Sequence, residues 1–253
     1  MRTEPIVRWY NIMKISLYAL AGALCAVASA PAVANAEEAP DSYGENGVII
    51  VTATTAYDDA EERANKTAGG TDIVSYLDYA DKSPVSLRDT LAFSPGIYLQ
   101  PRYGQEIRIS IRGSGLSRGF HQRGLTLLQD GIPINLADDN GDFQELEPIF
   151  FDHLEVYRGA NALRFGSGTL GGAVNGVTPT GKTASGLYLR ADAGSFDSYR
   201  GLVSYGFDDG QVDGWAAVSA DTSDGDRDHA DRRSFRFHGN IGVRLSETVS
   251  TRF

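Results

Sequence analysis

Two glycine-rich motifs have the spacing of phosphate-binding loops. Residues 176–183 read GVTPTGKT and fit the G-x-x-x-x-G-K-[ST] pattern, in which backbone amides and a lysine hold nucleotide phosphates. Residues 166–171 read GSGTLG and fit G-x-G-x-x-G, with Asp192 about twenty residues further on, as a dinucleotide site requires. Both sites need a helix directly after the glycines, because its N-terminus holds the phosphate. The stretch after Gly171 is rich in Gly and Pro, and residues 184–194 alternate as a strand does, so we predict no nucleotide site.

The other residue types that perform chemistry are too scattered to form a site. Residues 138–142 and 221–231 carry carboxylates spaced by two, as calcium loops do, but both lack the glycine at the sixth position and the closing glutamate. A G-x-S-x-G nucleophile motif is absent from the sequence. No two histidines have the i, i+4 spacing of a metal-binding helix; they are His121, His153, His229 and His238. We therefore expect no enzyme, no metal site and no cofactor.

The first 36 residues have the order of a secretory signal. Arg2, Arg8 and Lys14 precede an apolar stretch from residue 15 to about residue 30, and small residues ending at Ala36 precede two glutamates. A membrane-spanning anchor is the alternative, but the stretch is shorter than the ~20 residues that a spanning helix needs. The sequence predicts cleavage after Ala36 and export of residues 37–253.

Composition limits the partners of the exported part. The only cysteine, Cys25, lies inside the signal, so the mature chain has no disulfide or thiol chemistry. The signal carries three positive charges and one negative charge, so its removal changes the net charge from -10 to -12. So acidic a chain is not expected to bind nucleic acid.

The segment before residue 182 contains a free β-prone run and then a mixed α/β pattern. Residues 37–47 are acidic and turn-forming, and residues 48–54 (VIIVTAT) are β-prone and uncharged. That run is either the first strand of the next domain or a segment kept free for a partner. Further on, the sequence predicts a short helix with capping-box spacing and strands with the DG turn of a hairpin; these are residues 86–93, 107–111, 125–129, 132–134 and 154–157.

After Lys182 the pattern changes to a sustained alternation of apolar and polar residues. Strands of about ten residues are joined by a tight turn at residues 208–210 and a long acidic loop at residues 222–232. This combination is typical of a transmembrane β-barrel, although a soluble β-sandwich gives the same alternation. The export signal and the preceding segment favour the barrel.

Four motifs carry a family resemblance. Residues 154–175 (LEVYRGANALRFGSGTLGGAVN) resemble the end of the plug domain of TonB-dependent outer-membrane receptors. Residues 109–113 (ISIRG) resemble the plug strand that ends in VRG, and residues 129–133 (QDGIP) resemble the LDGVP hairpin of the family. The run at residues 48–54 is similar to the TonB box. Residues 113–116 and 120–124 are most similar to the ferric-citrate receptor branch.

The resemblance implies an α/β plug domain, with a small mixed sheet and short helices, followed by the first antiparallel strands of an incomplete barrel. The implied divisions are a signal peptide, a flexible leader, the TonB box, the plug and the first barrel strands: residues 1–36, 37–47, 48–54, 55–182 and 183–253. The family barrel has roughly 22 strands, and Phe253 falls in about the fifth, so we expect a truncated fragment.

The resemblance also implies a function. It predicts energised uptake of a ferric chelate, of siderophore or ferric-citrate type, or of a similar scarce nutrient such as a cobalamin, in the outer membrane of a Gram-negative bacterium. The implied partners are outer-membrane lipid and TonB with its inner-membrane energising complex, TonB pairing as an added strand. A soluble exported β-rich binding or adhesion module is the alternative.

Particular residues inherit roles from the resemblance. Arg112 and Arg158 correspond to plug arginines that pair with glutamates on the barrel wall; in this chain we expect both to be solvated. Loops at the plug apex place cationic or polar groups where an anionic chelate binds, namely Gln100, Arg102, Arg118 and Arg123. The residues expected to bind TonB are Val48, Ile49, Ile50, Val51, Thr52, Ala53 and Thr54.

Overall fold

A computed structural model of the chain describes residues 56–67, 69–102, 104–115, 123–246 and 249–253. These residues belong to one compact unit, Ala53–Phe253. The predicted signal peptide, leader and TonB box lie outside the described residues, and so does Arg118. Within the described ranges, no helix is long and apolar enough to cross a membrane.

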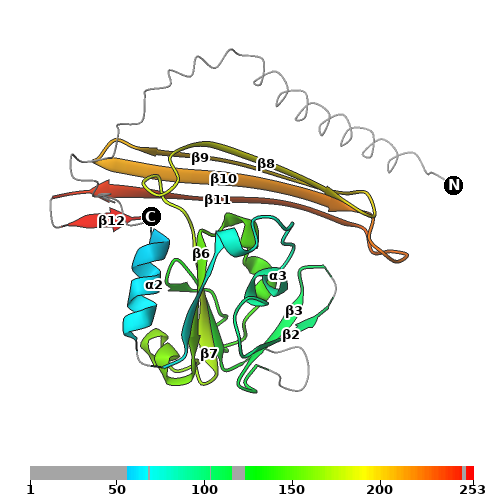
Figure 1. The fold of residues 1–253 in the computed structure, drawn as a ribbon, viewed down its shortest axis with the longest axis horizontal. Coiled ribbons are helices and arrows are strands. Elements are labelled where there is room, and N and C mark those ends of the chain that lie inside the picture. The colour runs from blue at the N-terminus through cyan, green and yellow to red at the C-terminus, as the bar shows by residue number, and fades with distance from the viewer. Residues whose placement is uncertain (1–55, 68, 103, 116–122, 247–248) are drawn as a thin grey trace, which may run out of the picture. The chain divides into compact units, whose positions relative to one another are not determined.

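The first half of the described chain is an α/β domain built around a five-stranded mixed sheet (Figure 1). The strand order is β1-β6-β7-β4-β5; only the β4–β7 pair is parallel. The strands are β1 (Thr71–Ser75), β4 (Leu125–Gln129), β5 (Ile132–Pro133), β6 (His153–Arg158) and β7 (Gly172–Val177). The predicted strands over residues 125–129 and 154–157 are confirmed, and so is the hairpin at Asp130 and Gly131.

Short helices and a hairpin cover this sheet. The predicted helix forms as α3 (Leu87–Leu91), because the Asp89 carboxylate accepts hydrogen bonds from the backbone amides of Val85 and Ser86 at 2.9 and 3.1 Å. A separate two-stranded hairpin joins β2 (Ile97–Pro101) to β3 (Ile107–Ile111). The domain also contains the 3-10 helices η1 (Tyr76–Asp78), η2 (Phe143–Glu145), η3 (Pro148–Phe150) and the longer η4 (Gly159–Phe165).

A helix also forms between residue 54 and the predicted helix over residues 86–93, where the sequence predicted no element. Helix α2 (Ala56–Lys66) has acidic residues in its first turn and Arg63 and Lys66 in its last. Charges of these signs at the two ends stabilise a helix through its dipole. Glu62 and Lys66 add an ion pair one turn apart. The helix lies against β1, and its Ala60 is 1% exposed.

The core of the α/β domain is a cluster of buried apolar side chains. Strand β3 contributes Ile107, Ile109 and Ile111, as its alternation predicts, although Ser110 is buried as well. These side chains pack with residues from α3 and the central strands, among them Leu87, Leu91, Leu125, Leu127, Leu154, Val156 and Val174. Burying aliphatic side chains of this size stabilises a fold by about 1.5–3 kcal/mol each.

The second half of the described chain is an antiparallel meander, here called the strand sheet. Its order is β12-β11-β10-β9-β8, so every strand pairs with its neighbours in sequence. The tight turn predicted at residues 208–210 links β9 to β10, and the long loop, residues 224–231, links β10 to β11. The strands are β8 (Gly186–Gly194), β9 (Ser198–Asp208), β10 (Val212–Ser223), β11 (Arg232–Arg244) and β12 (Ser250–Arg252).

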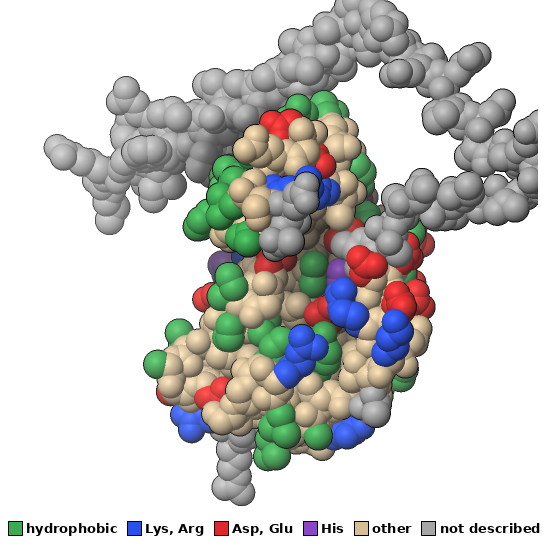
Figure 2. Space-filling view, turned by 90° about the vertical axis from the view of Figure 1, so that its left-hand side faces the viewer, with side chains coloured by type: hydrophobic (Ala, Val, Ile, Leu, Met, Phe, Trp, Pro, Cys, Tyr) green, Lys and Arg blue, Asp and Glu red, His purple; other side chains and the backbone are tan. Residues whose placement is uncertain are grey.

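The two faces of the strand sheet differ. One face carries large apolar side chains that are exposed to solvent, including Leu187, Leu189, Tyr199, Tyr205, Phe235, Phe237 and Ile241. The other face packs on the α/β domain and mixes polar with apolar side chains, including Arg200, Leu202, Ser204, Asp213, Trp215 and Ala217. Figure 2 shows hydrophobic side chains along the margin of the upper part of the molecule, while acidic, basic and histidine side chains gather where it meets the part below.

Candidate functional site

A buried carboxylate occupies the boundary between the α/β domain and the strand sheet. Glu147 directly precedes η3, and its side chain is 3% exposed. Its Oε1 atom contacts the Arg200 guanidinium of β9, and its Oε2 atom lies 3.2 Å from Nε of Arg236 on β11. Gln105, at the tip of the β2–β3 hairpin, donates to the same Oε2 atom at 3.1 Å and accepts from Arg236. One glutamate thus joins two strands and a hairpin.

The electrostatics of this group combine opposing effects. Burial raises the pKa of Glu147, and the guanidinium groups of Arg200 and Arg236 act in the opposite direction. Arg200 also donates to the carbonyl oxygen of Pro84, just before α3. Two guanidinium groups from the strand sheet therefore neutralise one carboxylate of the α/β domain.

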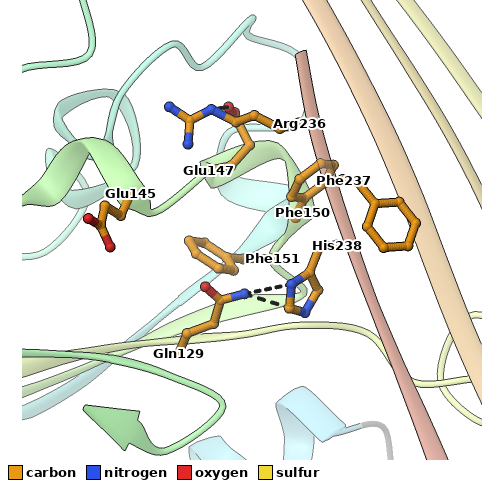
Figure 3. A pocket seen from close by; sticks show the side chains of 8 residues that line it. All are labelled: Gln129, Glu145, Glu147, Phe150, Phe151, Arg236, Phe237 and His238. Carbon is orange, nitrogen blue, oxygen red and sulfur yellow. Dashed lines mark hydrogen bonds and ion pairs between the residues drawn. The ribbon is translucent and has the colours of Figure 1, made fainter. Parts of the chain in front are cut away.

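An aromatic cluster and a small cavity lie beside Glu147 (Figure 3). The ring of Phe150 stacks on His238 with centroids 6.3 Å apart and meets Trp215 edge-on at 6.4 Å. The His238 ring contacts the side-chain amide of Gln129, with its Nδ1 atom 3.0 Å from Nε2. The cavity of about 190 Å³ is smaller than the ~300 Å³ at which ligand pockets begin, so it is no place for a chelate.

The segment with the nucleotide-type motif serves as a connection between the two halves. Lys182 lies 3.6 Å from the Asp213 carboxylate of β10, and the Thr183 hydroxyl accepts from the backbone amide of Thr180 at 2.9 Å. Strand β8, and not a helix, follows this segment. Strand β7 likewise follows the glycines of residues 166–171, so neither motif has the helix that phosphate binding needs.

A second buried carboxylate lies inside the α/β domain. Glu155 of β6 accepts hydrogen bonds from Asn175 Nδ2 at 2.8 Å and from the Tyr157 hydroxyl at 3.1 Å. Burial opposes ionisation, but the nearby His153 and the hydrogen bonds from Asn175 and Tyr157 outweigh it and lower the pKa of Glu155 to about 2. The Arg63 guanidinium of α2 lies 3.6 Å from the same carboxylate. This cluster borders a cavity of about 440 Å³.

The two arginines expected on the barrel-facing surface differ from each other. Arg158 is not solvated: its side chain is 12% exposed, and it donates to Ser94 Oγ at 2.7 Å and to Asp72 Oδ2 at 3.2 Å. The expectation of a solvated guanidinium is therefore wrong for Arg158, because a carboxylate and a hydroxyl of its own domain hold it. Arg112 is exposed, as expected, and lies over Gly70 and Gly159, where any Cβ atom would come within 3.1 and 2.8 Å of its guanidinium. Pairing with barrel glutamates stays a prediction for both.

The described residues predicted to contact ligand lie on or near exposed loops. Gln100 of β2 is exposed opposite Arg108, and Arg102 forms an ion pair with Glu106 at the hairpin tip. Arg123 lies on another loop, 3.5 Å from Asp138. Their role in ligand binding stays a prediction.

Sequence reasoning missed the group around Glu147. The alternation of β11 does put Arg236 and His238 on its polar side, which was the available signal. The carboxylate partner of Arg236 lies about ninety residues earlier in a loop without periodicity, so nothing local pointed to Glu147.

A model of the TonB-dependent receptor plug domain matches residues 63–173 of this chain. Those residues therefore have the fold of a TonB-dependent receptor plug domain. The match lies inside the predicted plug, residues 55–182, and the strand sheet supplies the partial barrel wall.

Curated relatives carry receptor and transporter names. The ferric-pyoverdine receptor PbuA of a Pseudomonas strain is 31% identical over 135 residues, which is 51% of this chain and 16% of the relative. The vitamin B12 transporter BtuB of Photobacterium profundum is 24% identical over 231 residues, which is 90% of this chain and 36% of the relative. The chain thus spans well under half the length of these relatives.

Solved structures show the same fold. The pyoverdine outer membrane receptor FpvA of Pseudomonas aeruginosa superposes with a TM-score of 0.58 at 22% identity, over 74% of this chain and 27% of that chain. The siderophore receptor PirA of Acinetobacter baumannii gives a TM-score of 0.54 at 20% identity, over 79% of this chain and 32% of that chain. The chain is accordingly an outer-membrane protein of a Gram-negative bacterium. Its place in the ferric-citrate branch stays a prediction.

Proposed function

We propose that this chain forms the plug and the first wall strands of a TonB-dependent receptor that imports a ferric chelate of siderophore or ferric-citrate type. The observation that carries the proposal is a plug domain followed directly by a strand sheet whose mixed face packs on the plug and whose opposite face exposes large apolar side chains. Relatives named for ferric pyoverdine support a ferric chelate, and relatives named for vitamin B12 make a cobalamin the competing cargo.

The exposed apolar face favours a membrane wall over a soluble exported module. Leu187, Phe235 and Phe237 are 58%, 69% and 68% exposed on the same face of the sheet. A soluble module would bury such a face against a second layer, because large contiguous apolar patches are rare on soluble proteins. Lipid covers it in the proposed receptor.

The ligand end of the plug follows from the loop lengths. Long loops of outer-membrane barrels are extracellular and short turns are periplasmic, so the loop at residues 224–231 faces outside. The β2–β3 hairpin tip lies near this end: a Cβ atom on Gly104 would be 3.8 Å from Cδ of Arg232, the first residue of β11. Arg102 and Glu106 occupy the same tip. An anionic chelate would compete with this carboxylate for the arginine.

The energised step uses the segment ahead of α2. Residues 48–54 are uncharged and β-prone, which suits strand addition to TonB. Helix α2 follows them and is held to β6 by the Arg63–Glu155 ion pair and by the edge-on contact of Tyr57 with His153. Force on residues 48–54 would therefore reach α2 and β6 first.

Uptake by the full-length receptor tests this proposal. Cells that carry the receptor, with Val51→Pro or Val51→Thr, are offered radiolabelled ferric citrate, a ferric hydroxamate, a ferric catecholate and cobalamin. We expect uptake of one ferric chelate to disappear in Val51→Pro while binding to the cell surface persists, because proline removes an amide donor from the added strand. Val51→Thr keeps that amide and should transport normally. Normal uptake by Val51→Pro would refute the TonB box, and uptake of cobalamin alone would refute the ferric cargo.

A further inference from the structure

The plug packs on the strand sheet through an apolar contact, which does not by itself fix the position of one surface on the other. Ile149 and Phe150 of η3 pack against Leu202, Trp215 and Ala217 of β9 and β10. Apolar burial is roughly proportional to area and does not specify one register of two surfaces. Something else must fix where η3 sits on the wall.

Glu147 stands immediately before this contact and has the geometry to fix it. Its partners come from two strands that do not pair with each other, because β10 lies between β9 and β11. Each carboxylate oxygen takes a different guanidinium, so Glu147 bridges Arg200 and Arg236 across β10. The hydrogen bond from Arg200 to Glu147 depends on distance and angle, and the ion pair with Arg236 depends on distance, so together they specify position where apolar packing does not.

The same carboxylate also contacts the β2–β3 hairpin, which lies at the proposed ligand end. Gln105 uses its amide nitrogen on Glu147 and its amide oxygen on Arg236, so it closes a ring of three side chains. Its neighbours Arg102 and Glu106 belong to the hairpin tip. Movement of the tip toward a ligand would therefore act on this ring.

We propose that Glu147 is the positioning residue that seats the plug on β9 and β11, and that Gln105 couples this seat to the β2–β3 hairpin. The polarity is the reverse of the pairing expected for Arg112 and Arg158, since here the plug supplies the acid and the wall supplies the arginines. The seat rests on the structure of the plug and the strand sheet, whereas its coupling to cargo rests on the proposed function.

Hydrogen exchange in the full-length receptor tests the seat without any transport assay. Glu147→Gln keeps shape but removes the charge, and Glu145→Gln is the matched control, because Glu145 borders the same cavity but is exposed. We expect amide exchange over residues 146–151 to accelerate on the order of a hundredfold in Glu147→Gln, since the buried Arg200 and the partly exposed Arg236 lose their counter-charge. Exchange over β6 and β7 should not change, and Glu145→Gln should match the wild type.

Three outcomes would overturn the proposal. Wild-type exchange in Glu147→Gln would show that apolar packing alone seats the plug. Equal acceleration over residues 146–151 and over β6 and β7 would show general loss of plug stability and not a positioning role. Additive effects of Glu147→Gln and Arg236→Gln in the double variant would show that the two side chains act independently.

The coupling is tested with Gln105→Ala in the same receptor. We expect ferric-chelate binding to change the rate of amide exchange over residues 146–151 in the wild type. In Gln105→Ala, saturating ligand should leave that rate unchanged. A ligand response that survives in Gln105→Ala would refute the coupling while leaving the seat intact. If none of the offered chelates binds the wild type, the cargo proposal fails, and the exchange of Glu147→Gln without ligand still decides the seat.

Discussion

Glu155 and Glu147 are both buried carboxylates of the plug, but their partners come from different places. Glu155 is served by Asn175 and Tyr157, which lie in its own sheet, and burial fails to prevent its ionisation. Glu147 depends on Arg200 and Arg236, which belong to the strand sheet, and burial raises its pKa. The interior of the plug is therefore complete without the wall, whereas its boundary is not.

This difference distinguishes side chains that stabilise the plug from side chains that position it on the strand sheet. A group whose partners are local contributes to folding of the plug in any context, because the hydrogen bonds form with the sheet. A group whose partners lie on the wall loses those partners, and the burial that the wall provides, when the wall is missing. The comparison predicts that substitutions inside the plug lower its stability both in isolation and in the receptor. Substitutions at the boundary should lower it only when β9 and β11 are present.

The largest effect is expected for Glu155→Leu. This change leaves Asn175 and the Tyr157 hydroxyl without their acceptor in a site where Glu155 is 7% exposed. Removing one member of such a buried charged cluster costs about 3–5 kcal/mol. Chemical unfolding of the receptor, followed by a probe in the plug, should show this loss, and a loss under 1 kcal/mol would contradict the self-contained interior.

Acid should remove the contribution of Glu155 over a defined range. Its folded-state pKa of about 2 lies below the ordinary glutamate pKa of 4.5, so its stabilisation is present above pH 4.5 and is lost as the pH falls toward 2. A shift of this size corresponds to about 3 kcal/mol. Unfolding measured from pH 6 to pH 2 should show a steeper decline in wild type than in Glu155→Gln, and identical pH profiles would contradict the assignment.

Substitution of Arg158 or Arg112 should destabilise the plug less than Glu155→Leu does, and to different extents. Arg158→Ala leaves Asp72 without its cation and Ser94 without a donor, which we expect to cost about 2–3 kcal/mol of plug stability. Arg112→Ala should cost under about 1 kcal/mol, because the guanidinium is exposed. Urea midpoints of the two variants test this ranking, and an equal loss in both would place Arg112 inside the plug as well.

The smallest effect is expected for Arg63→Ala. The Arg63 side chain is 64% exposed, so its ion pair with Glu155 should contribute under about 1 kcal/mol to stability. The same pair nevertheless ties α2 to β6, and we expect faster hydrogen exchange in α2 with little change in the unfolding midpoint. Unchanged exchange in α2 would show that other contacts hold this helix.

Local signals account for the elements that could be predicted from sequence. Strand β3 follows from alternation, the turn at Asp130 and Gly131 from its residue types, and α3 from its capping box. Helix α2 was missed because it shows more charge than apolar periodicity. Strand β1 was missed because its two apolar residues, Ile73 and Val74, are adjacent instead of alternating, and β2 because it ends at a proline.

Only one side of the boundary site could be predicted from the sequence. Alternation puts Arg236 on the polar side of its strand, but the choice of Glu147 as partner is set by how η3 packs on the wall. The internal partners of Arg158 were missed for the same reason: Asp72 and Ser94 are distant in sequence and approach it only after the sheet forms.

The most direct test of the account compares the two glutamates in two contexts. Glu155→Gln and Glu147→Gln are introduced into the plug alone, residues 55–182, and into the full-length receptor, and the unfolding midpoint of the plug is measured in each. We predict that Glu155→Gln destabilises the plug in both contexts, and that Glu147→Gln destabilises it only in the receptor, where Arg200 and Arg236 surround the carboxylate. Equal destabilisation by Glu147→Gln in both contexts would show that Glu147 serves the plug interior and would contradict its role at the wall.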